Sequence, residues 1–269
     1  MSTSSFKKIS AAAIAVVLGL SAASHAGTLY STGFETTDGY SAGTGSLSLI
    51  GQPAVNPWAY YPGEATNPAY VNNSTGGTVI DGAQSVTLTQ PGTSSGYTDV
   101  YKSNLGATVS TGNVLTTTVS MNTALGGGTA QSFAGVEVLD GSNVVASFYV
   151  SDDAGHQDLS VSDGANGLTP VAGFAPAGDG ITGTYTLSID PSNDSFTVAF
   201  GGQTASGYLG TFTSGDPVDV SLSTIDAGVA GGATFDDFSV TSAVPEPASI
   251  AMIGLGGLLL LAKRPKRLA

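Results

Sequence analysis

Apolar and polar residues alternate with a period of two in short runs, and this pattern constrains the fold more than any other feature of the chain. From Ile181 to Ile189, apolar residues and one glycine occupy the odd positions, and threonine or serine occupies the even ones. In an extended strand this alternation puts every second side chain on one face. Residues 190–194 supply turn residues, and Phe196, Val198 and Phe200 resume the alternation. Residues 181–200 are therefore predicted to form a β-hairpin.

The same alternation recurs along the chain between glycine-rich loops. Glycine accounts for 38 of the 269 residues, about twice its ordinary usage. Many short β segments at regular spacing favour an all-β fold, an antiparallel two-sheet β-sandwich of jelly-roll topology. A solenoid is the rival fold, although no repeat of fixed period is found. Further strands are expected at 84–90, 114–121, 133–139, 144–150, 159–162, 218–224 and 233–241, with a tight turn at 140–143.

The N-terminus, residues 1–26, has the parts of a secretory signal peptide. Lys7 and Lys8 precede an apolar stretch from Ile9 to Leu20, and Ser24-His25-Ala26 supplies the small residues that a signal peptidase recognises. We expect a helix here and cleavage after Ala26. An uncleaved membrane helix is the alternative, but the apolar stretch is short for one.

The C-terminus, residues 244–269, is a second targeting segment. As a helix, its apolar run from Ile250 to Ala262 would span about 20 Å, less than the roughly 30 Å of a bilayer's hydrocarbon core. A short transmembrane helix that holds the chain only transiently is therefore expected. The run lies between Pro245, Glu246 and Pro247 and a basic stop-transfer group that favours a cytoplasmic C-terminus: Lys263, Arg264, Lys266 and Arg267.

This order of parts resembles the PEP-CTERM sorting signal of Gram-negative bacteria. The resemblance rests on Pro245 to Pro247, the apolar run and the basic tail, in that order at the end of the chain. It implies that exosortase, a membrane-embedded peptidase, cuts near the Pro-Glu-Pro element at the inner membrane. The protein would then reach the cell surface or the extracellular matrix. An ordinary tail anchor behind a proline-rich spacer is the alternative.

The body between the two targeting segments, residues 27–243, is almost purely acidic. Its only cation is Lys102, against 19 carboxylates, which gives a net charge of −18. Nucleic acid is excluded as a partner, because binding a polyanion requires clustered lysine and arginine. Anionic lipid surfaces are disfavoured for the same reason. The charge favours divalent cations as ligands outside the cell, or it serves solubility alone.

Short motifs in the body resemble concanavalin-A-like and laminin-G-like jelly-roll domains. They are Gly33-Phe34-Glu35, Gly39 to Gly43 and Gly51-Gln52 with Trp58 near the start, and Asp190 to Gly202 and Ala233 to Val240 near the end. The resemblance implies a sandwich fold for residues 27–243. By analogy with carbohydrate-binding jelly rolls, it also implies that Glu35 on the first strand and Asp236 on the last share a structural Ca²⁺.

Calcium suits such a chain because it binds six to eight oxygen ligands from carboxylates, carbonyls and water. Strict alternation places Asp236 on the same face as Phe238 and Val240, toward the core, where a carboxylate needs a partner. The aspartate-rich segment 152–158 is a second candidate. Turn-forming or solvated aspartates are the alternative for both sites.

Groups for ordinary catalysis are scarce. The chain has no cysteine, and His156, expected in an exposed loop, is the only histidine left after signal cleavage. Glycoside hydrolysis needs two carboxyl groups that flank the bond. Jelly-roll glucanases carry them as Glu-x-Asp-x-Glu on one strand, a spacing that does not occur here, and Glu137 has no acidic residue two positions away. No catalytic residue is assigned and an enzyme is not expected, although an aspartate-based site stays formally open.

Binding of a sugar would use an aromatic platform, because the C–H faces of a pyranose ring stack on tryptophan or tyrosine. Trp58, Tyr60 and Tyr61 lie in a proline-bracketed loop at 56–64. They are the candidate ligand-binding residues. The alternative is a loop that folds back and buries Trp58 as a lid on the core.

The sequence thus predicts a non-enzymatic exported protein of the cell surface or of an exopolysaccharide (biofilm) matrix. A lectin-like carbohydrate-binding module is the first alternative, and a glycan hydrolase or lyase is the next. The expected partners are signal peptidase, an exosortase-like peptidase and an extracellular polysaccharide.

Overall fold

The computed structural model of the chain describes residues 25–61, 68–75, 78–91, 96–124, 132–141, 143–153, 156–162, 169–170, 181–213, 216–226 and 230–244. The predicted terminal helices, the Pro245–Pro247 motif and the basic tail lie outside these ranges. Among the described residues, no helix has both the length and the hydropathy needed to cross a membrane.

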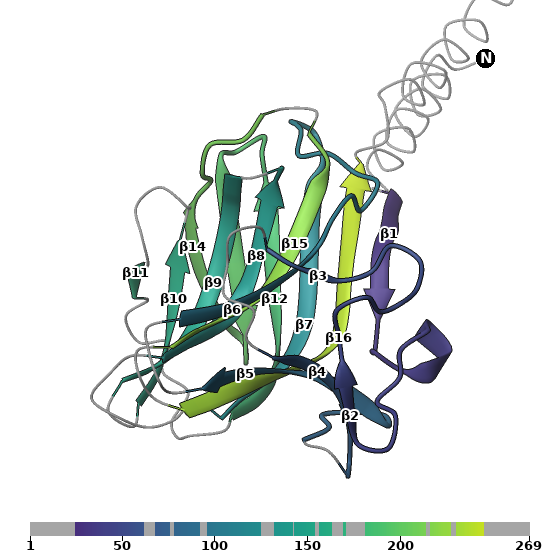
Figure 1. Cartoon of the computed structure of the whole chain (residues 1–269). Coiled ribbons are helices and arrows are strands. Elements are labelled where there is room, and N and C mark those ends of the chain that lie inside the picture. The colour runs from purple at the N-terminus through teal and green to yellow at the C-terminus, as the bar shows by residue number, and fades with distance from the viewer. Residues whose placement is uncertain are drawn as a thin grey trace, which may run out of the picture. The chain divides into compact units, whose positions relative to one another are not determined.

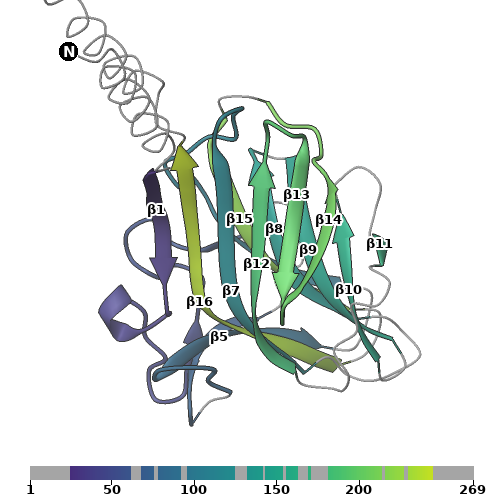
Figure 2. The same ribbon diagram turned by 180° about the vertical axis from the view of Figure 1, so that it is seen from behind.

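The chain folds into two antiparallel β-sheets (Figures 1 and 2). The first has nine strands, in the order β14-β13-β12-β7-β16-β5-β4-β2, with β1 also paired to β16. Its strands are β1 (His25–Thr32), β2 (Ser46–Ser48), β4 (Ala69–Asn73), β5 (Gln84–Pro91), β7 (Val114–Ala124), β12 (Ile181–Asp190), β13 (Ser195–Phe200), β14 (Gln203–Tyr208) and β16 (Ala230–Val244).

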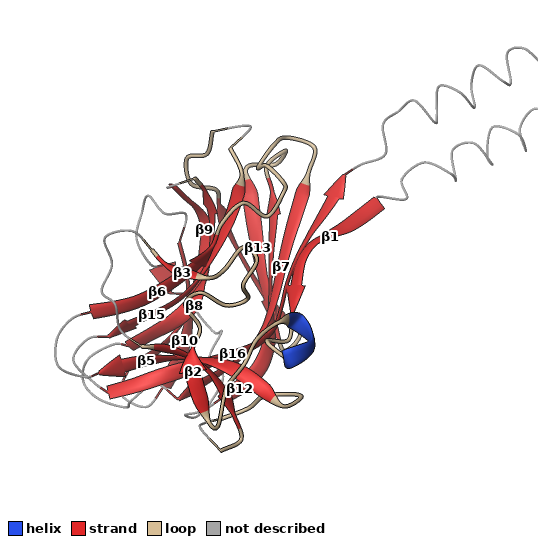
Figure 3. Ribbon diagram, turned by 45° about the vertical axis from the view of Figure 1, so that its right-hand side comes forward, coloured by secondary structure: helices blue, strands red, loops and turns tan. Residues whose placement is uncertain are grey.

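The second sheet has seven strands, in the order β11-β10-β9-β8-β15-β6-β3. The described residues also include one short 3₁₀ helix, η1 (Thr36–Asp38), drawn in blue in Figure 3. Strands far apart in the sequence are neighbours in both sheets, so the predicted sandwich is confirmed and the solenoid is wrong. The seven strands are β3 (Ala59–Tyr60), β6 (Gly96–Lys102), β8 (Ser132–Asp140), β9 (Asn143–Asp153), β10 (His156–Ser162), β11 (Thr169–Pro170) and β15 (Val218–Asp226).

All strands predicted from alternation are present. The 181–200 hairpin is β12 and β13, which pair from Thr186↔Ala199 to Asp190↔Ser195 around the expected turn. The turn at 140–143 joins β8 to β9 through the pair Asp140↔Asn143. Strands β1–β4, β6, β11 and β14 were not predicted.

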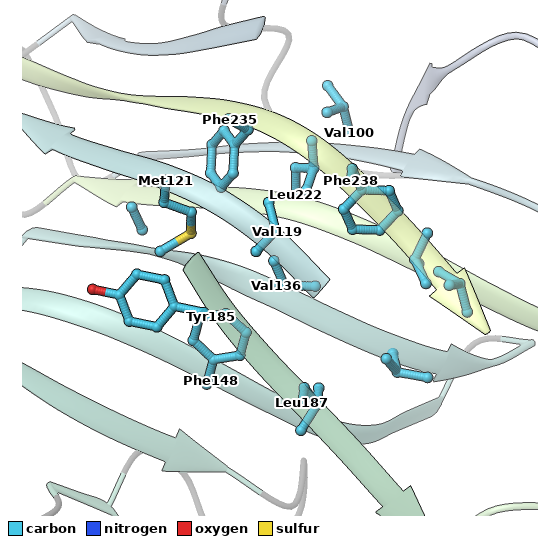
Figure 4. Packing of buried hydrophobic residues seen from close by; sticks show 14 of the residues in the cluster. Val100, Val119, Met121, Val136, Phe148, Tyr185, Leu187, Leu222, Phe235 and Phe238 are labelled. Atoms are coloured by element: carbon cyan, nitrogen blue, oxygen red, sulfur yellow. The ribbon is translucent and has the colours of Figure 1, made fainter. Parts of the chain in front are cut away.

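The facing sides of the two sheets form one apolar core (Figure 4). At its centre, Tyr185 of β12 stacks on Phe148 of β9, with ring centroids 5.3 Å apart, and on Phe200 of β13 at 4.3 Å. Burial of each such ring contributes roughly 1.5–3 kcal/mol to stability, and each stacked pair adds about 1 kcal/mol. The core thereby joins strands of both sheets.

Three glycines inside strands make room for aromatic rings. A Cβ added to Gly183 would lie 2.1 Å from the Phe200 ring, and one added to Gly207 would lie 2.5 Å from the Phe196 ring. On the seven-stranded sheet, a Cβ on Gly135 would lie 2.0 Å from the backbone carbonyl oxygen of Phe148 and 2.8 Å from the Tyr149 ring. Glycine in these strands therefore allows close approach of a ring to the backbone.

At Asp237, strand β16 changes both its pairing partner and the face of the sheet to which alternate side chains point. It pairs with β5 as far as Phe235↔Val86, and it then runs beside β7 and β1 (Figure 2). Phe235 and Phe238 are both fully buried, although strict alternation would put residues three apart on opposite faces. Asp237, with φ of 46°, is the extra residue that restores the apolar side chains to the core. The prediction that Asp236 shares the core-directed face of Phe238 is therefore wrong.

Candidate functional sites

The predicted aromatic loop folds back onto the core. Trp58 has no exposed surface, and its Nε1–H donates to the Tyr40 hydroxyl at 2.9 Å. The Trp58 ring also contacts Phe34, Tyr30 and Phe238, with centroids 6.0–6.3 Å away. A ring enclosed in this way cannot stack on a sugar. The binding role predicted for Trp58 is therefore wrong, and the alternative of a buried lid holds.

Lys102, the only cation of the body, is buried beneath this loop. It is 2% exposed; its Nζ donates to the carbonyl oxygen of Asn56 and lies 5.1 Å from the centroid of the Tyr30 ring. Burial lowers the pKa of Lys102 to about 8. A carbonyl and an aromatic face thus replace the water lost by the ammonium group. We refer to Tyr30, Tyr40, Trp58 and Lys102 as the aromatic–lysine cluster.

The two tyrosines of the same loop are only partly buried. Tyr61 packs edge-on against Tyr101 of β6, with ring centroids 5.7 Å apart. Tyr60 pairs with Val100 in the sheet, and burial raises the pKa of its hydroxyl. Tyr60 and Tyr61 therefore stay candidates for contact with a ligand, and Tyr101 joins them.

Both predicted calcium ligands contact the same segment, residues 81–85. The Glu35 carboxylate accepts hydrogen bonds from the backbone N–H groups of Ala83 and Gln84, at 2.6 and 3.0 Å. The Asp236 carboxylate accepts from the N–H of Asp81 at 3.1 Å and from the Ser85 hydroxyl at 2.7 Å. These contacts tie the start of β5 to the two ends of the body.

Asp236 is 1% exposed, and its second oxygen accepts from the Asp237 N–H at 2.9 Å. Burial nevertheless raises the pKa of Asp236 to about 6, because three donors compensate only part of the lost hydration. Glu35 Oε1 and both Asp236 oxygens accept hydrogen bonds from N–H and O–H donors. Across the described ranges, no three His, Cys, Asp or Glu side chains are grouped as metal ligands. Shared binding of Ca²⁺ by this pair stays a prediction.

A third polar group lies on the face of the seven-stranded sheet that points away from the core. There the Tyr149 hydroxyl donates to the Glu137 carboxylate, and the Ser221 hydroxyl donates to the Asp99 carboxylate. Tyr149 is 4% exposed, and burial together with the charge of Glu137 raises its pKa well above the usual value. We call these four residues the outer-face cluster. Ser221 has no exposed surface and Asp99 is 7% exposed, so Glu137, which is only partly buried, is the member of this cluster that a ligand could contact.

Sequence spacing alone does not reveal this cluster. Glu137 and Asp99 lie on β8 and β6, on either side of β15, and the register pairs Glu137 with Ser221 and Asp99 with Ser223. The one sequence signal for this cluster is the period-two alternation, because both acids occupy outward-facing positions between buried residues.

The second predicted metal segment, 152–158, joins β9 to β10, with Asp153 paired to His156. His156 therefore begins a strand instead of lying in a loop.

Residues 243–267 match the PEP-CTERM protein-sorting motif. This match contains the predicted sorting residues and confirms the resemblance seen at the C-terminus. The motif implies export, membrane-associated sorting to the cell surface and processing by exosortase. No match was found among curated proteins.

Similarity to one solved structure, a glucanase, confirms a jelly-roll-like sandwich. An endo-1,3-beta-glucanase from Streptomyces sioyaensis superposes with a TM-score of 0.52 at 13% identity, covering 82% of this chain and 97% of the glucanase. The CBM2 module of the evolved Dit of Lactobacillus casei BL23 phage J-1 gives 0.46 at 12% identity, with coverages of 82% and 97%. A sialidase gives 0.46 at 9% identity over 79% of this chain, which spans only 20% of the sialidase. Identities this low establish similarity of fold alone.

Proposed function

We propose that the mature protein is a non-enzymatic component of the cell surface or of an extracellular polysaccharide matrix. The sorting motif at residues 243–267 carries this proposal, because it specifies where the chain is delivered. The last described strand of the sandwich, β16, ends at Val244, immediately before the sorting residues. Cleavage near Pro247 would therefore remove none of the described strands.

Intact mass of the protein from the exopolymer fraction of its host tests this proposal, with and without the processing peptidase. We expect a chain that begins near Gly27 and ends near Pro247, and accumulation of the uncut tail in the membrane fraction when the peptidase is absent. An intact tail in the membrane fraction of peptidase-containing cells would overturn the sorting step.

Carbohydrate binding is the second candidate function, and the partly buried residues Glu137, Tyr61 and Tyr101 favour it. The Glu137 carboxylate and the rings of Tyr61 and Tyr101 belong to the same sheet region, because Ser221 of β15 pairs with Tyr101 on one side and with Glu137 on the other, and Tyr61 packs against Tyr101. Polar acceptors beside aromatic rings suit a sugar, which has hydroxyl groups and apolar faces. Affinity electrophoresis against neutral and acidic polysaccharides tests this function. Tyr101→Ala is expected to abolish retardation, and unchanged retardation would exclude the Tyr61–Tyr101 surface.

The absence of catalysis is the third part of the proposal. The Ser221 hydroxyl donates to Asp99, which is almost completely buried, so Glu137 and Asp99 cannot both flank a glycosidic bond. We therefore expect no products when the protein is incubated with β-1,3-glucan. Release of reducing ends by the wild type, lost in Glu137→Gln, would make the outer-face cluster an active site instead.

A further inference from the structure

We propose that the outward face of strands β7 and β12 binds the surface of ice. We call this surface the hydroxyl face. It consists of eight small polar side chains in four cross-strand pairs: Thr116↔Ser188, Thr118↔Thr186, Ser120↔Thr184 and Asn122↔Thr182. Both strands belong to the nine-stranded sheet, and neither the sorting residues nor the Tyr61–Tyr101 surface lies on them.

The strand register makes the hydroxyl face a regular array. Its residues alternate with buried residues such as Val119 and Tyr185, so they point away from the core. All of them except Ser120 are at least partly exposed. Hydroxyl groups face one another across the two strands: the Ser120 and Thr184 oxygens are 3.2 Å apart, and the oxygens of the first pair are 3.4 Å apart. The side chains are thereby held in rows.

No charged side chain lies on the hydroxyl face or on the outward positions of the two strands that follow β12 in the sheet. These strands, β13 and β14, lie beside β12 (Figure 2). Their outward residues are Ser195, Thr197, Ala199, Thr204, Ser206 and Tyr208. The outward positions of the seven-stranded sheet, by contrast, include Asp99, Glu137 and Asp219. Threonine is favoured in strands generally, but that preference acts on both sheets and does not explain why this part of one sheet carries no charge.

Two spacings define the array. Opposite residues of an antiparallel pair lie about 5 Å apart, and successive residues of one face lie roughly 7 Å apart along a strand. Oxygen atoms on the prism faces of ice repeat with similar spacings in two perpendicular directions. Threonine hydroxyls on such a grid can occupy lattice positions of water, while their methyl groups exclude liquid water between the rows. Because a sheet twists by about 20–25° from strand to strand, the match is confined to two adjacent strands.

Two other partners fit the hydroxyl face less well. A second copy of the chain would bring together two bodies of net charge −18 through polar side chains that bury little apolar surface. A polysaccharide would need aromatic rings on which to stack, and the exposed ring of Tyr208 lies on β14, two strands away from β12. Ice needs neither apolar area nor aromatic rings, and it is uncharged, as the hydroxyl face is.

Substitutions at Thr184 test the hydroxyl face without disturbing the fold, because this side chain is exposed. Thr184→Lys puts a long charged side chain into the middle of the array. Thr184→Val removes only the hydroxyl group and keeps the shape and the strand preference of the residue. Thr211→Lys is the matched control, because Thr211 is exposed in the segment between β14 and β15 and the substitution changes the net charge equally.

The measurement is the partition of the exported protein into a slowly growing ice front, with inhibition of ice recrystallisation measured in parallel. We expect the wild type and Thr211→Lys to be enriched in the ice and Thr184→Lys to be excluded from it. The concentration of Thr184→Lys needed to inhibit recrystallisation should be at least about tenfold higher than that of the wild type. Thr184→Val should lie between them, and all four proteins should unfold within about 2 °C of one another.

The proposal is overturned if the wild type is excluded from ice, or if Thr184→Lys enters ice as readily as Thr211→Lys does. Retention of the wild type on a neutral polysaccharide, or its dimerisation, without enrichment in ice and lost in Thr184→Lys, would assign the hydroxyl face to that partner instead. None of these outcomes depends on where the protein is delivered, so the proposed function can fail or succeed independently.

Discussion

The aromatic–lysine cluster and the region around Asp236 both bury a charged group, and they compensate it differently. Lys102 has a carbonyl acceptor and the face of the Tyr30 ring, inside a shell of aromatic side chains. Asp236 has backbone N–H groups, one hydroxyl and a second carboxylate next to it. The first charge is enclosed by the core. The second lies on the opposite side of β16, beside Gly33 and residues 81–85.

Because of this difference, the two regions are expected to contribute to stability in different ways. The aromatic–lysine cluster is a complete set of contacts, so its residues are expected to affect stability alone. The region around Asp236 has more negative charge than its donors compensate, and its stability is therefore expected to depend on pH.

Trp58→Ala should have the largest effect. It removes a fully buried ring and its hydrogen bond to Tyr40, so we expect a loss of about 3–5 kcal/mol in the free energy of unfolding, measured with urea. Trp58→Phe keeps most of the packing and should lose roughly half as much. If Trp58→Ala instead left stability unchanged and abolished binding to polysaccharide, the enclosed position of Trp58 would be wrong.

Asp236→Ala should have the second largest effect, a loss of roughly 2–3 kcal/mol in the free energy of unfolding in metal-free buffer. The substitution leaves the Asp81 N–H and the Ser85 hydroxyl without their acceptor, and an unsatisfied buried donor costs about 1–3 kcal/mol. Asp236→Asn retains an acceptor oxygen and should be milder. Equal losses for both variants would show that packing, not acceptance of hydrogen bonds, is the role of Asp236.

Local patterns predicted the strands well, whereas long-range register could not be predicted. The 181–200 hairpin follows from alternation and turn residues alone, since its pairing is local. Strand β6 was missed because Lys102 and Thr98 occupy inward positions where an apolar residue is expected. The prediction that the Asp236 side chain points toward the core was wrong because Asp237, whose backbone is in the left-handed region, shifts the alternation by one residue. The Glu137–Asp99 pair needs the order of β8, β15 and β6, which no spacing along the chain encodes.

Mild acid should stabilise the metal-free protein. The pKa of Asp236 is raised from 3.8 to about 6, so the folded state holds this proton more tightly than the unfolded state does. The resulting stability is fully present below about pH 4 and is lost as the pH rises through 6. We expect about 1–2 kcal/mol more stability at pH 4.5 than at pH 7 in EDTA.

The matched control for this pH profile is Asp236→Asn. Burial also raises the pKa of Asp140 and Asp219, and these carboxyls contribute a slope of the same sign in both proteins. Only the difference between the two profiles belongs to Asp236. Parallel profiles would mean that Asp236 does not titrate in this range.

Titration of Lys102 should have the smallest effect on stability. Its effect has the opposite sign to that of Asp236 and falls in a higher pH range. The pKa of Lys102 is lowered from 10.5 to about 8, so between these values the unfolded state binds the proton and the folded state does not. Stability should therefore rise as the pH increases from 7.5 to 9.5, by on the order of 1 kcal/mol, because the aromatic–lysine cluster then encloses a neutral amine. Lys102→Met keeps a long apolar side chain and should abolish the rise in urea unfolding curves. A fall in stability over this range, present in the wild type and absent in Lys102→Met, would show that the Asn56 carbonyl and the Tyr30 ring stabilise the charged amine more than burial destabilises it.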